Sequence, residues 1–266
     1  MNIDKKYYQE INENLTNTIQ DTNISAPNKK VGKVRDAYFL NDKVVMISTD
    51  RQSAFDRVLA AIPYKGAVLN SVSAWWFKKT EHLFPNHLIS TPDPNVSIVE
   101  KCTVFPVEFV VRGYITGTTD TSLWTVYNNG DREYCGNSLP EGLKKNDKLD
   151  KPMLTPTTKD KVHDRPVSRE EIIDLRLMSA EDYDLAAKMS LDLFAFGQET
   201  AKKNGLILVD TKYEIGTDSK GKIKFVDEIH TPDSSRFWIS SSYKDRISSG
   251  QEPENIDKEF LRLWFA

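Results

Sequence analysis

The spacing of apolar and polar residues in the first half of the chain predicts strands more often than helices. Residues 32–50 alternate in the way of two strands that meet at a turn around residues 41–42. The run VVMIST in this stretch is apolar and β-branched, which is typical of a buried strand. Residues 67–84 change to a period near 3.6 and predict a helix. Its apolar stripe holds Val68, Val72, Trp75 and Trp76.

Strand character returns at residues 100–117, and a long irregular segment follows at residues 128–165, which are rich in Gly, Asn, Pro, Lys and Asp. Loops of that length are usually functional or disordered. The first 30 residues are polar and rich in Asn, which predicts a short helix and a loose lead-in.

Two further helices carry their own start signals. Ser168 stands three residues before Glu171, and Ser179 stands three residues before Asp182, as in capped helix starts. Gly205 suits the position that ends the second of these helices.

Residues 206–230 read as a hairpin, LILVDTKYEIG and then KFVDEIH around the polar turn TDSKGK. Because side chains in a strand alternate between its two faces, Asp210, Lys212 and Glu214 share one face. With residues 217–222 as the turn, Glu214 lies near Asp227 across the hairpin. Taken together, the elements predict a mixed α+β protein built on antiparallel sheets, in two lobes.

Composition narrows the class of protein. The 266 residues are 39% hydrophobic and 28% charged, with a formal net charge of −3, so non-specific attraction to nucleic acid or to a membrane surface gains no support. No apolar run is long enough to span a bilayer, and the first residues lack the apolar core of a signal peptide. Two cysteines form no disulfide framework, and we expect a cytoplasmic protein with reduced thiols.

The acidic hairpin is the first candidate site. Facing carboxylates such as Glu214 and Asp227 repel each other unless a cation lies between them. Oxygen ligands with no His or Cys nearby suit Mg²⁺, which often binds one or two carboxylates together with phosphate oxygens. Lys212 on the same face could neutralise phosphate. The alternative is a solvated strand face with a lysine between two acids.

Two segments in the first half also hold candidate residues. Gly32 and Lys33 stand at the entrance to a strand, where backbone N–H groups can approach phosphate, although on these residues alone an ordinary turn before a strand is the simpler explanation. Ser53 and Asp56 follow the buried strand in STDRQSAFDRV, a common place for site residues. The alternative there is a turn whose Asp and Ser bind local backbone.

Two segments in the second half contain arginines suited to anions. Arg112 ends an apolar strand, where its guanidinium could bind a phosphate or a carboxylate or could simply be solvated. The segment HTPDSSRFW gathers Ser234, Ser235 and Arg236 in one turn, which is more specific than a lone basic residue. His230 is more often structural than catalytic in such a setting.

These motifs resemble the SAICAR synthetase family when they are taken together. The family signatures LILVDTKYEIG and VDEIHTPDSSR are present. GKVRD, TDRQSAFD, IPYKGAVLNSVSAWWF and VVRGYITGT match as well, and all six lie in order across most of residues 31–238.

The resemblance implies two lobes with ATP between them. The lobe at residues 1–108 would be similar to the small lobe of protein kinases, and the lobe at residues 109–266 to ATP-grasp enzymes. It also implies a reaction in which carboxyaminoimidazole ribotide (CAIR), L-aspartate and ATP give SAICAR, ADP and phosphate. Activation of a carboxylate as an acyl phosphate needs positioning and neutralised charge rather than a protein nucleophile, and no nucleophile motif is present.

The resemblance assigns roles by position in this sequence. For ATP it implies a phosphate loop with Gly32, Lys33 and Arg35, and Glu108 in the hinge beside adenine. Lys212, Glu214 and Asp227 would hold ATP and Mg²⁺, with Glu214 and Asp227 as the metal ligands. Asp210 joins Lys212 in the catalytic set. The CAIR 5′-phosphate would be bound by Arg112, Thr118 and Arg236, and the other substrate-side residues would be Ser53, Asp56, Asp164, Asp233 and Ser234. The lysine or arginine that binds L-aspartate stays open.

Thr118 stands where many relatives have Ser, which retains the hydroxyl. Two other functions remain as alternatives. A small-molecule phosphotransferase could use the same ATP site, although no catalytic-loop motif of the HRD type is present. A nucleotide-binding module without turnover would have no need of the acidic hairpin or of TPDSSR.

Overall fold

The structure, a computed structural model, describes residues 5–54, 57–159 and 164–258. The chain divides into two compact units. Unit 1 comprises Met1–Lys78 and His87–Lys101, and unit 2 comprises Lys79–Asn86 and Cys102–Ala266. The division lies before strand β8 (Thr103–Tyr114), whereas a boundary at residue 108 would fall inside that strand. Among the described residues, there is no helix with the length and apolar character needed to cross a membrane.

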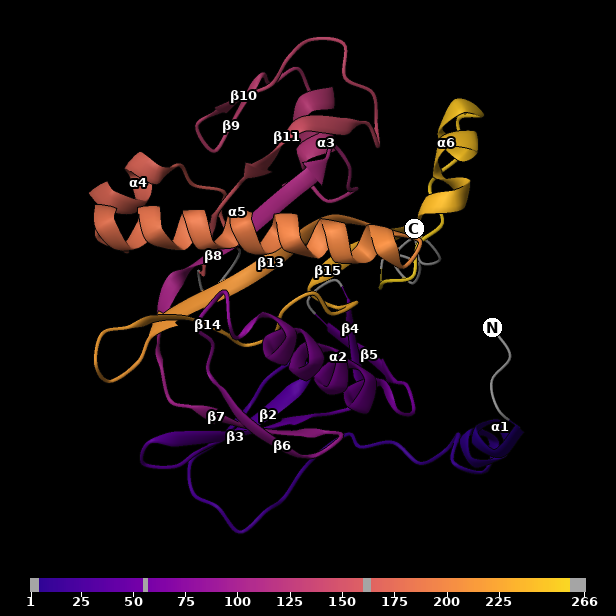
Figure 1. Ribbon diagram of the computed structural model, residues 1–266, viewed down its shortest axis with the longest axis vertical. Helices are drawn as coiled ribbons and strands as arrows, with labels where there is room; N and C mark the ends of the chain where they lie inside the picture. Colours follow the sequence, from indigo (N-terminus) through magenta and orange to yellow (C-terminus); the bar gives the residue numbers. More distant parts are fainter. Residues whose placement is uncertain (1–4, 55–56, 160–163, 259–266) are drawn as a thin grey trace. The chain divides into compact units, whose positions relative to one another are not determined.

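Unit 1 is built on a five-stranded antiparallel sheet with the strand order β1-β2-β3-β7-β6 (Figure 1). A separate hairpin joins β4 and β5. The elements of this unit are α1 (Lys5–Glu13), β1 (Lys29–Val31), β2 (Arg35–Phe39), β3 (Lys43–Ser48), β4 (Arg51–Ala54), β5 (Arg57–Ala61), α2 (Lys65–Thr80), β6 (Leu88–Asp93) and β7 (Val96–Glu100). Most of α2 belongs to unit 1, and its last two residues belong to unit 2.

The start of α2 is fixed by Asp50, two residues after the end of strand β3. The Asp50 carboxylate accepts hydrogen bonds from the backbone N–H groups of Gly66, at 2.9 Å, and Ile19, at 2.8 Å. A carboxylate at a helix start satisfies N–H groups that have no partner inside the helix. Asp50 therefore has a structural role, but it binds backbone 16 and 31 residues away rather than the local backbone of its own turn. Helix α2 buries Leu69, Trp76 and Phe77.

Unit 2 is organised around strand β13 (Leu206–Thr217), which pairs with β8, β14 and β15 in one antiparallel sheet. Strands β11 and β12 pair with β8 on its other edge. The remaining strands are β9 (Glu133–Tyr134), β10 (Asn137–Ser138), β11 (Lys148–Leu154), β12 (Thr157–Thr158), β14 (Ile223–Val226) and β15 (Ser235–Ile239). The central position of β13 brings side chains from three neighbouring strands together on each face.

One face of this sheet is covered by α5 (Ala180–Lys203), which runs along β13 and β8 (Figure 1). Val209, Tyr213 and Ile215 are fully buried, as expected for the apolar side of an alternating strand. The opposite side of β13 carries the charged residues. The other helices are α3 (Leu123–Asn128), α4 (Arg169–Asp174) and α6 (Ser240–Ser248).

The helix signals in the sequence are confirmed. The Ser168 hydroxyl accepts a hydrogen bond from the Glu171 N–H, and the Glu171 carboxylate accepts one from the Ser168 N–H, which is a complete capping box. The Ser179 hydroxyl caps α5 by accepting a hydrogen bond from the Asp182 N–H, and it donates to the Asp182 carboxylate at 2.8 Å. Gly205 follows the end of α5 with φ of 73°, a conformation that glycine adopts without strain.

The predicted fold class, mixed α+β with antiparallel sheets, is confirmed, since every pairing between the named strands is antiparallel. The helix predicted over residues 67–84 ends at Thr80. Residues 128–165 are less irregular than expected, because four short strands, β9 to β12, lie within them.

Candidate active site

Three neighbouring strands place a row of charges on the polar face of the sheet. In the register of the sheet, Asp210 on β13 lies opposite Arg112 on β8 and opposite Arg236 on β15. The Arg236 Nη1 donates to Asp210 Oδ2 at 2.5 Å, and the Arg112 Nη1 lies 4.0 Å from the same oxygen. Two guanidiniums thus share one carboxylate, which leaves a net positive charge for an anion.

Arg112 is held from its other side as well. Its Nε donates to the Thr155 hydroxyl at 2.8 Å, and that hydroxyl in turn donates to the Val110 carbonyl oxygen at 3.3 Å. The Arg112 side chain is only 10% exposed. Arg112 is therefore not a solvated surface arginine, and a buried guanidinium with fixed partners is chemically suited to an anion.

A second charged group lies two residues further along β13, about 7 Å away at the usual rise of a strand. The Lys212 Nζ donates to Glu108 Oε1 at 2.6 Å and to Glu214 Oε1 at 3.4 Å. The other oxygen of Glu214 forms an ion pair with Lys159. Burial acts to lower the pKa of the Lys212 ammonium, but Glu214, Glu108 and Asp227 outweigh it and raise that pKa. Lys212 is therefore a permanent cation.

The β13–β14 hairpin places Glu214 within one residue of Asp227 across the pair of strands, close to the sequence-based expectation. Glu214 lies opposite Val226, and Asp227 follows the end of β14 with φ of 63°. The carboxylate directly across from Glu214 is Glu108 on β8. The acids that face each other are thus Glu108 and Glu214, and the Lys212 ammonium binds both of them.

The turn after β14 is tied together by one hydroxyl. The Thr231 Oγ1 donates to Glu228 Oε2 at 2.6 Å and accepts hydrogen bonds from the N–H groups of Asp233 and Ser234. The Lys212 N–H donates to the Ser234 carbonyl at 3.0 Å, which attaches the turn to β13. The Glu228 carboxylate therefore stabilises the turn. The Asp227 carboxylate is close enough to Lys212 to help raise the pKa of its ammonium.

His230 is a structural residue of the same turn. It is 1% exposed, and its Nε2 lies 2.5 Å from the Tyr213 hydroxyl oxygen. A methyl group added at Gly197 of α5 would lie 2.4 Å from the imidazole, so the helix has a glycine where the ring approaches it. Burial lowers the pKa of His230 from 6.5 to about 3.

That shift predicts an acid sensitivity of folding. Below pH 6.5 the unfolded chain protonates this imidazole while the folded protein does not, so stability falls as pH falls toward 3. Between pH 7 and pH 5 the contribution of His230 amounts to about 2 kcal/mol. Urea unfolding at both pH values should show this extra loss in the wild type and not in His230→Gln. Equal pH dependence in the two proteins would contradict it.

The polar face of the sheet opens into a cavity of about 290 Å³. Small-molecule sites have volumes of this order and upward. Its charged lining residues are Glu108, Arg112, Asp164, Asp210, Lys212, Asp233, Arg236, Asp257 and Lys258. Its hydroxyl-bearing lining residues are Thr119, Thr121, Ser122, Thr157, Thr211, Ser234 and Ser235.

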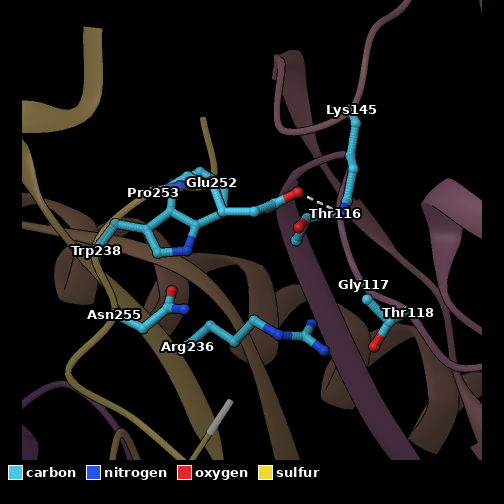
Figure 2. Close-up of a pocket in the computed structure, with 9 residues that line it drawn as sticks. All are labelled: Thr116, Gly117, Thr118, Lys145, Arg236, Trp238, Glu252, Pro253 and Asn255. Atoms are coloured by element: carbon cyan, nitrogen blue, oxygen red, sulfur yellow. Dashed lines mark hydrogen bonds and ion pairs between the residues drawn. The ribbon is translucent and has the colours of Figure 1, made fainter. Parts of the chain in front are cut away.

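A smaller pocket of about 20 Å³, the size of one water, adjoins the other side of Arg236 (Figure 2). Figure 2 shows the Arg236 guanidinium pointing toward Gly117 and Thr118. A methyl group at Gly117, where φ is 107°, would lie 3.6 Å from Arg236 Nη2. An ion pair of 2.5 Å between Lys145 and Glu252 closes the pocket on the opposite side.

The predicted site residues of unit 1 lie on two hairpins. Gly32 and Lys33 form the turn between β1 and β2, and Arg35 begins β2. The Gly32 N–H donates to the Arg35 carbonyl at 2.7 Å, and a methyl group at Gly32 would lie 2.8 Å from that oxygen. Only glycine fits there without a shift of the backbone. Ser53 lies on β4, and Asp56 lies outside the described residues.

The structure thus brings eight predicted residues of unit 2 together around the large cavity. They are Glu108, Arg112, Asp164, Asp210, Lys212, Asp233, Ser234 and Arg236. Glu214 and Asp227 lie beside Lys212, and Thr118 borders the smaller pocket.

Sequence reasoning missed Thr157, Asp257 and Lys258 in the cavity lining. Thr157 lies in the segment that reads as irregular, where no period indicates an orientation. Asp257 and Lys258 lie close to the end of the sequence, outside all the motifs described above. The tail is held to the sheet because Asp257 accepts a hydrogen bond from the Phe237 N–H at 2.8 Å.

The family model of SAICAR synthetase matches residues 28–266. The chain belongs to the SAICAR synthetase family. Membership makes it a ligase of purine biosynthesis. A phosphoribosylaminoimidazole-succinocarboxamide synthase from Legionella pneumophila is 59% identical over 248 residues, which are 93% of this chain and 80% of the relative.

Solved structures of SAICAR synthetases have the same fold. The SAICAR synthase from Saccharomyces cerevisiae complexed with SAICAR has a TM-score of 0.79 and 33% identity, over 92% of this chain and 86% of the other. A type-2 SAICAR synthetase in complex with ADP has a TM-score of 0.74 and 26% identity, over 90% of this chain and 91% of the other.

Proposed function

We propose that this SAICAR synthetase family member joins CAIR and L-aspartate, with conversion of ATP to ADP and phosphate, to give SAICAR. The observation that carries the proposal is the pair of charged groups on one face of β13. Arg112 and Arg236 surround Asp210, and two residues further Lys212 lies between Glu108 and Glu214. The two groups suit a substrate with a phosphate at one end and a carboxylate that reacts at the other.

The chemistry uses no protein nucleophile. A carboxylate oxygen of CAIR attacks the γ-phosphorus of ATP, the bond between that phosphorus and ADP breaks, and an acyl phosphate results. The amine of L-aspartate then attacks the acyl carbon, phosphate leaves, and the amine loses a proton. Both steps depend on aligned reactants and neutralised negative charge.

Arg112 and Arg236 are proposed to bind the 5′-phosphate of CAIR. Two guanidiniums match a dianion, because each can donate two parallel hydrogen bonds. Thr118 beside Arg236 would add a hydroxyl to the same group. Asp210 would keep both guanidiniums oriented when no phosphate is bound.

Lys212 is proposed to neutralise the phosphate that is transferred. Glu214 and Asp227 are proposed to hold Mg²⁺, and their carboxylate oxygens are ligands of the kind that this ion prefers. Within the described ranges, no three Asp, Glu, His or Cys side chains are placed to hold a metal by themselves. This agrees with an ion that takes its remaining ligands from phosphate and water. A bound Mg²⁺ would neutralise charge that develops on the phosphoryl oxygens.

Other predicted residues have proposed roles as well. Gly32, Lys33 and Arg35 would bind nucleotide phosphates, and Glu108, 2.6 Å from Lys212, would orient that ammonium beside the nucleotide. Ser53, Asp56, Asp164, Asp233 and Ser234 would be substrate-side groups. ADP bound to the type-2 SAICAR synthetase and SAICAR bound to the yeast enzyme support these ligand classes for a chain of the same family.

Three cations of the cavity lining, Arg112, Lys212 and Arg236, already have proposed roles. Lys258 lines the same cavity, and we propose that it binds a carboxylate of L-aspartate. Its backbone N–H donates to the Pro232 carbonyl at 3.3 Å, which places it beside the turn that holds Asp233. Lys258→Met should raise the KM for L-aspartate about tenfold or more and leave the KM for CAIR nearly unchanged. Lys244→Met, at an exposed position of α6, is the matched control. Equal KM values in the two variants would count against the role.

The proposed function is tested by ADP release from Mg-ATP with CAIR and L-aspartate added separately and together. We expect turnover only with all three, and a product with the mass of SAICAR. ADP release with CAIR alone and without an amide product would indicate a phosphotransferase instead. Nucleotide binding without turnover under any of these conditions would contradict the ligase assignment.

A further inference from the structure

Arg51, the first residue of β4, is a buried arginine that the proposed mechanism does not use. Its side chain is 9% exposed and forms a 2.6 Å ion pair with Asp36, whose side chain is fully buried. The guanidinium also donates to three backbone carbonyls. These are the carbonyls of Gln20 at 2.6 Å, Gly32 at 3.0 Å and Lys33 at 3.2 Å.

Two of those carbonyls belong to the glycine turn between β1 and β2. In a trans peptide, the carbonyl of one residue and the N–H of the next point in opposite directions. Because the carbonyls of Gly32 and Lys33 both point to Arg51, the N–H groups of Lys33 and Val34 point away from it. Successive N–H groups on one side of a turn form an anion-binding concavity.

The next carbonyl of the turn is fixed in a similar way. The Val34 carbonyl accepts hydrogen bonds from the Thr49 N–H at 2.9 Å and from the Thr49 hydroxyl at 2.8 Å. Residues 49 and 51 of one segment therefore hold three successive peptide groups of another. The Lys33 side chain at the tip of this turn is exposed.

We propose that Arg51 is a positioning residue that aims the N–H groups of Lys33 and Val34 at the phosphates of the nucleotide. The inference rests on the proposed function, in which the Gly32 turn binds nucleotide phosphates. Arg51 does not touch the nucleotide, and it acts through the peptide groups that its guanidinium orients. Only a planar fork of donors can hold Asp36 and both carbonyls at once.

Replacing Arg51 by lysine separates its proposed role in orienting the turn from its contribution to the stability of the fold. Arg51→Lys retains a cation beside the buried Asp36, so the ion pair persists, but an ammonium cannot also hold both carbonyls. Asp36→Asn is the complementary variant, because its amide oxygen still accepts from Arg51 while the ion pair is lost. We expect Asp36→Asn to lower stability and leave the orientation of the turn intact.

The test compares the dissociation constants of Mg-ATP and adenosine, measured by calorimetry on the full chain. Arg51→Lys should reduce the preference for ATP over adenosine about tenfold, and Lys33→Met should reduce it similarly. Asp36→Asn and the exposed control Arg57→Gln should keep the wild-type preference. A merely structural role of Arg51 would weaken both ligands together and would not change their ratio.

The outcomes separate the two claims. Loss of preference in Lys33→Met but not in Arg51→Lys would overturn the positioning role and leave the phosphate-binding turn in place. No loss in either would overturn both. If Arg51→Lys does not fold, amide NMR of the wild type decides. The N–H signals of Lys33 and Val34 should shift with Mg-ATP and not with adenosine, and shifts with neither ligand would overturn the inference.

Discussion

Replacing Glu214 by Gln should lower the kcat of amide formation at least about a hundredfold, which is the scale of losing one strong electrostatic contact to the transition state. Glu214 is proposed to bind Mg²⁺ through a carboxylate oxygen, and a neutral amide is a weaker ligand for this ion. The fold should survive, because Lys212 retains Glu108 at 2.6 Å and the repulsion between the two facing glutamates is removed.

The dependence on Mg²⁺ distinguishes this loss from a general one. Initial rates over a range of Mg²⁺ concentrations should show a higher requirement in Glu214→Gln and in Asp227→Asn. Thermal unfolding should show little change in either. Glu181→Gln, on the exposed side of α5, is the control for the substitution itself. Normal turnover in both acidic variants would remove the metal assignment.

The elements of the fold could be predicted because their signals are local. Ser168 and Ser179 start helices through hydrogen bonds to residues three positions away, and Gly205 ends one through its own backbone conformation. The shared face of Asp210, Lys212 and Glu214 likewise follows from the alternation of one strand. None of these features requires knowledge of a distant partner.

The pairing between strands was harder to predict. A hairpin register depends on how many residues the turn uses, so the sequence places Glu214 near Asp227 but does not indicate that Val226 is its direct partner. The sequence also gives no sign that Glu108, more than 100 positions earlier, lies directly across from Glu214. The pairing of β8 with β13 therefore corrects which acids face each other.

Arg51 and Lys258 show a different limit. Arg51 stood among several polar residues after a buried strand, and no local pattern indicates that its guanidinium holds the carbonyls of Gly32 and Lys33. Lys258 lies in a tail whose position depends on hydrogen bonds to β15 and to the turn at Pro232. Contacts between segments far apart in the chain determine both roles.

Replacing Arg236 by Ala should raise the KM for CAIR about ten- to a hundredfold, because a hydrogen bond to a charged group contributes about 1.5–3 kcal/mol. Arg112 would remain, with its Nη1 4.0 Å from Asp210 Oδ2. A single guanidinium, however, could not bind the phosphate from both sides. Arg236→Lys should have a smaller effect, since it retains the charge and loses the paired donors. The KM values for ATP and L-aspartate should change little.

The nucleoside form of CAIR, which lacks the 5′-phosphate, makes this prediction specific. The wild type should strongly prefer CAIR over this nucleoside, and Arg236→Ala should lose most of the preference while its kcat/KM for the nucleoside stays near the wild-type value. Arg169→Ala, which removes an exposed ion pair with Asp184 outside the cavity, should keep the preference. If Arg236→Ala still discriminated as the wild type does, the phosphate would have to bind elsewhere. The ion pairs of Arg112, Asp210 and Arg236 would then only stabilise the sheet.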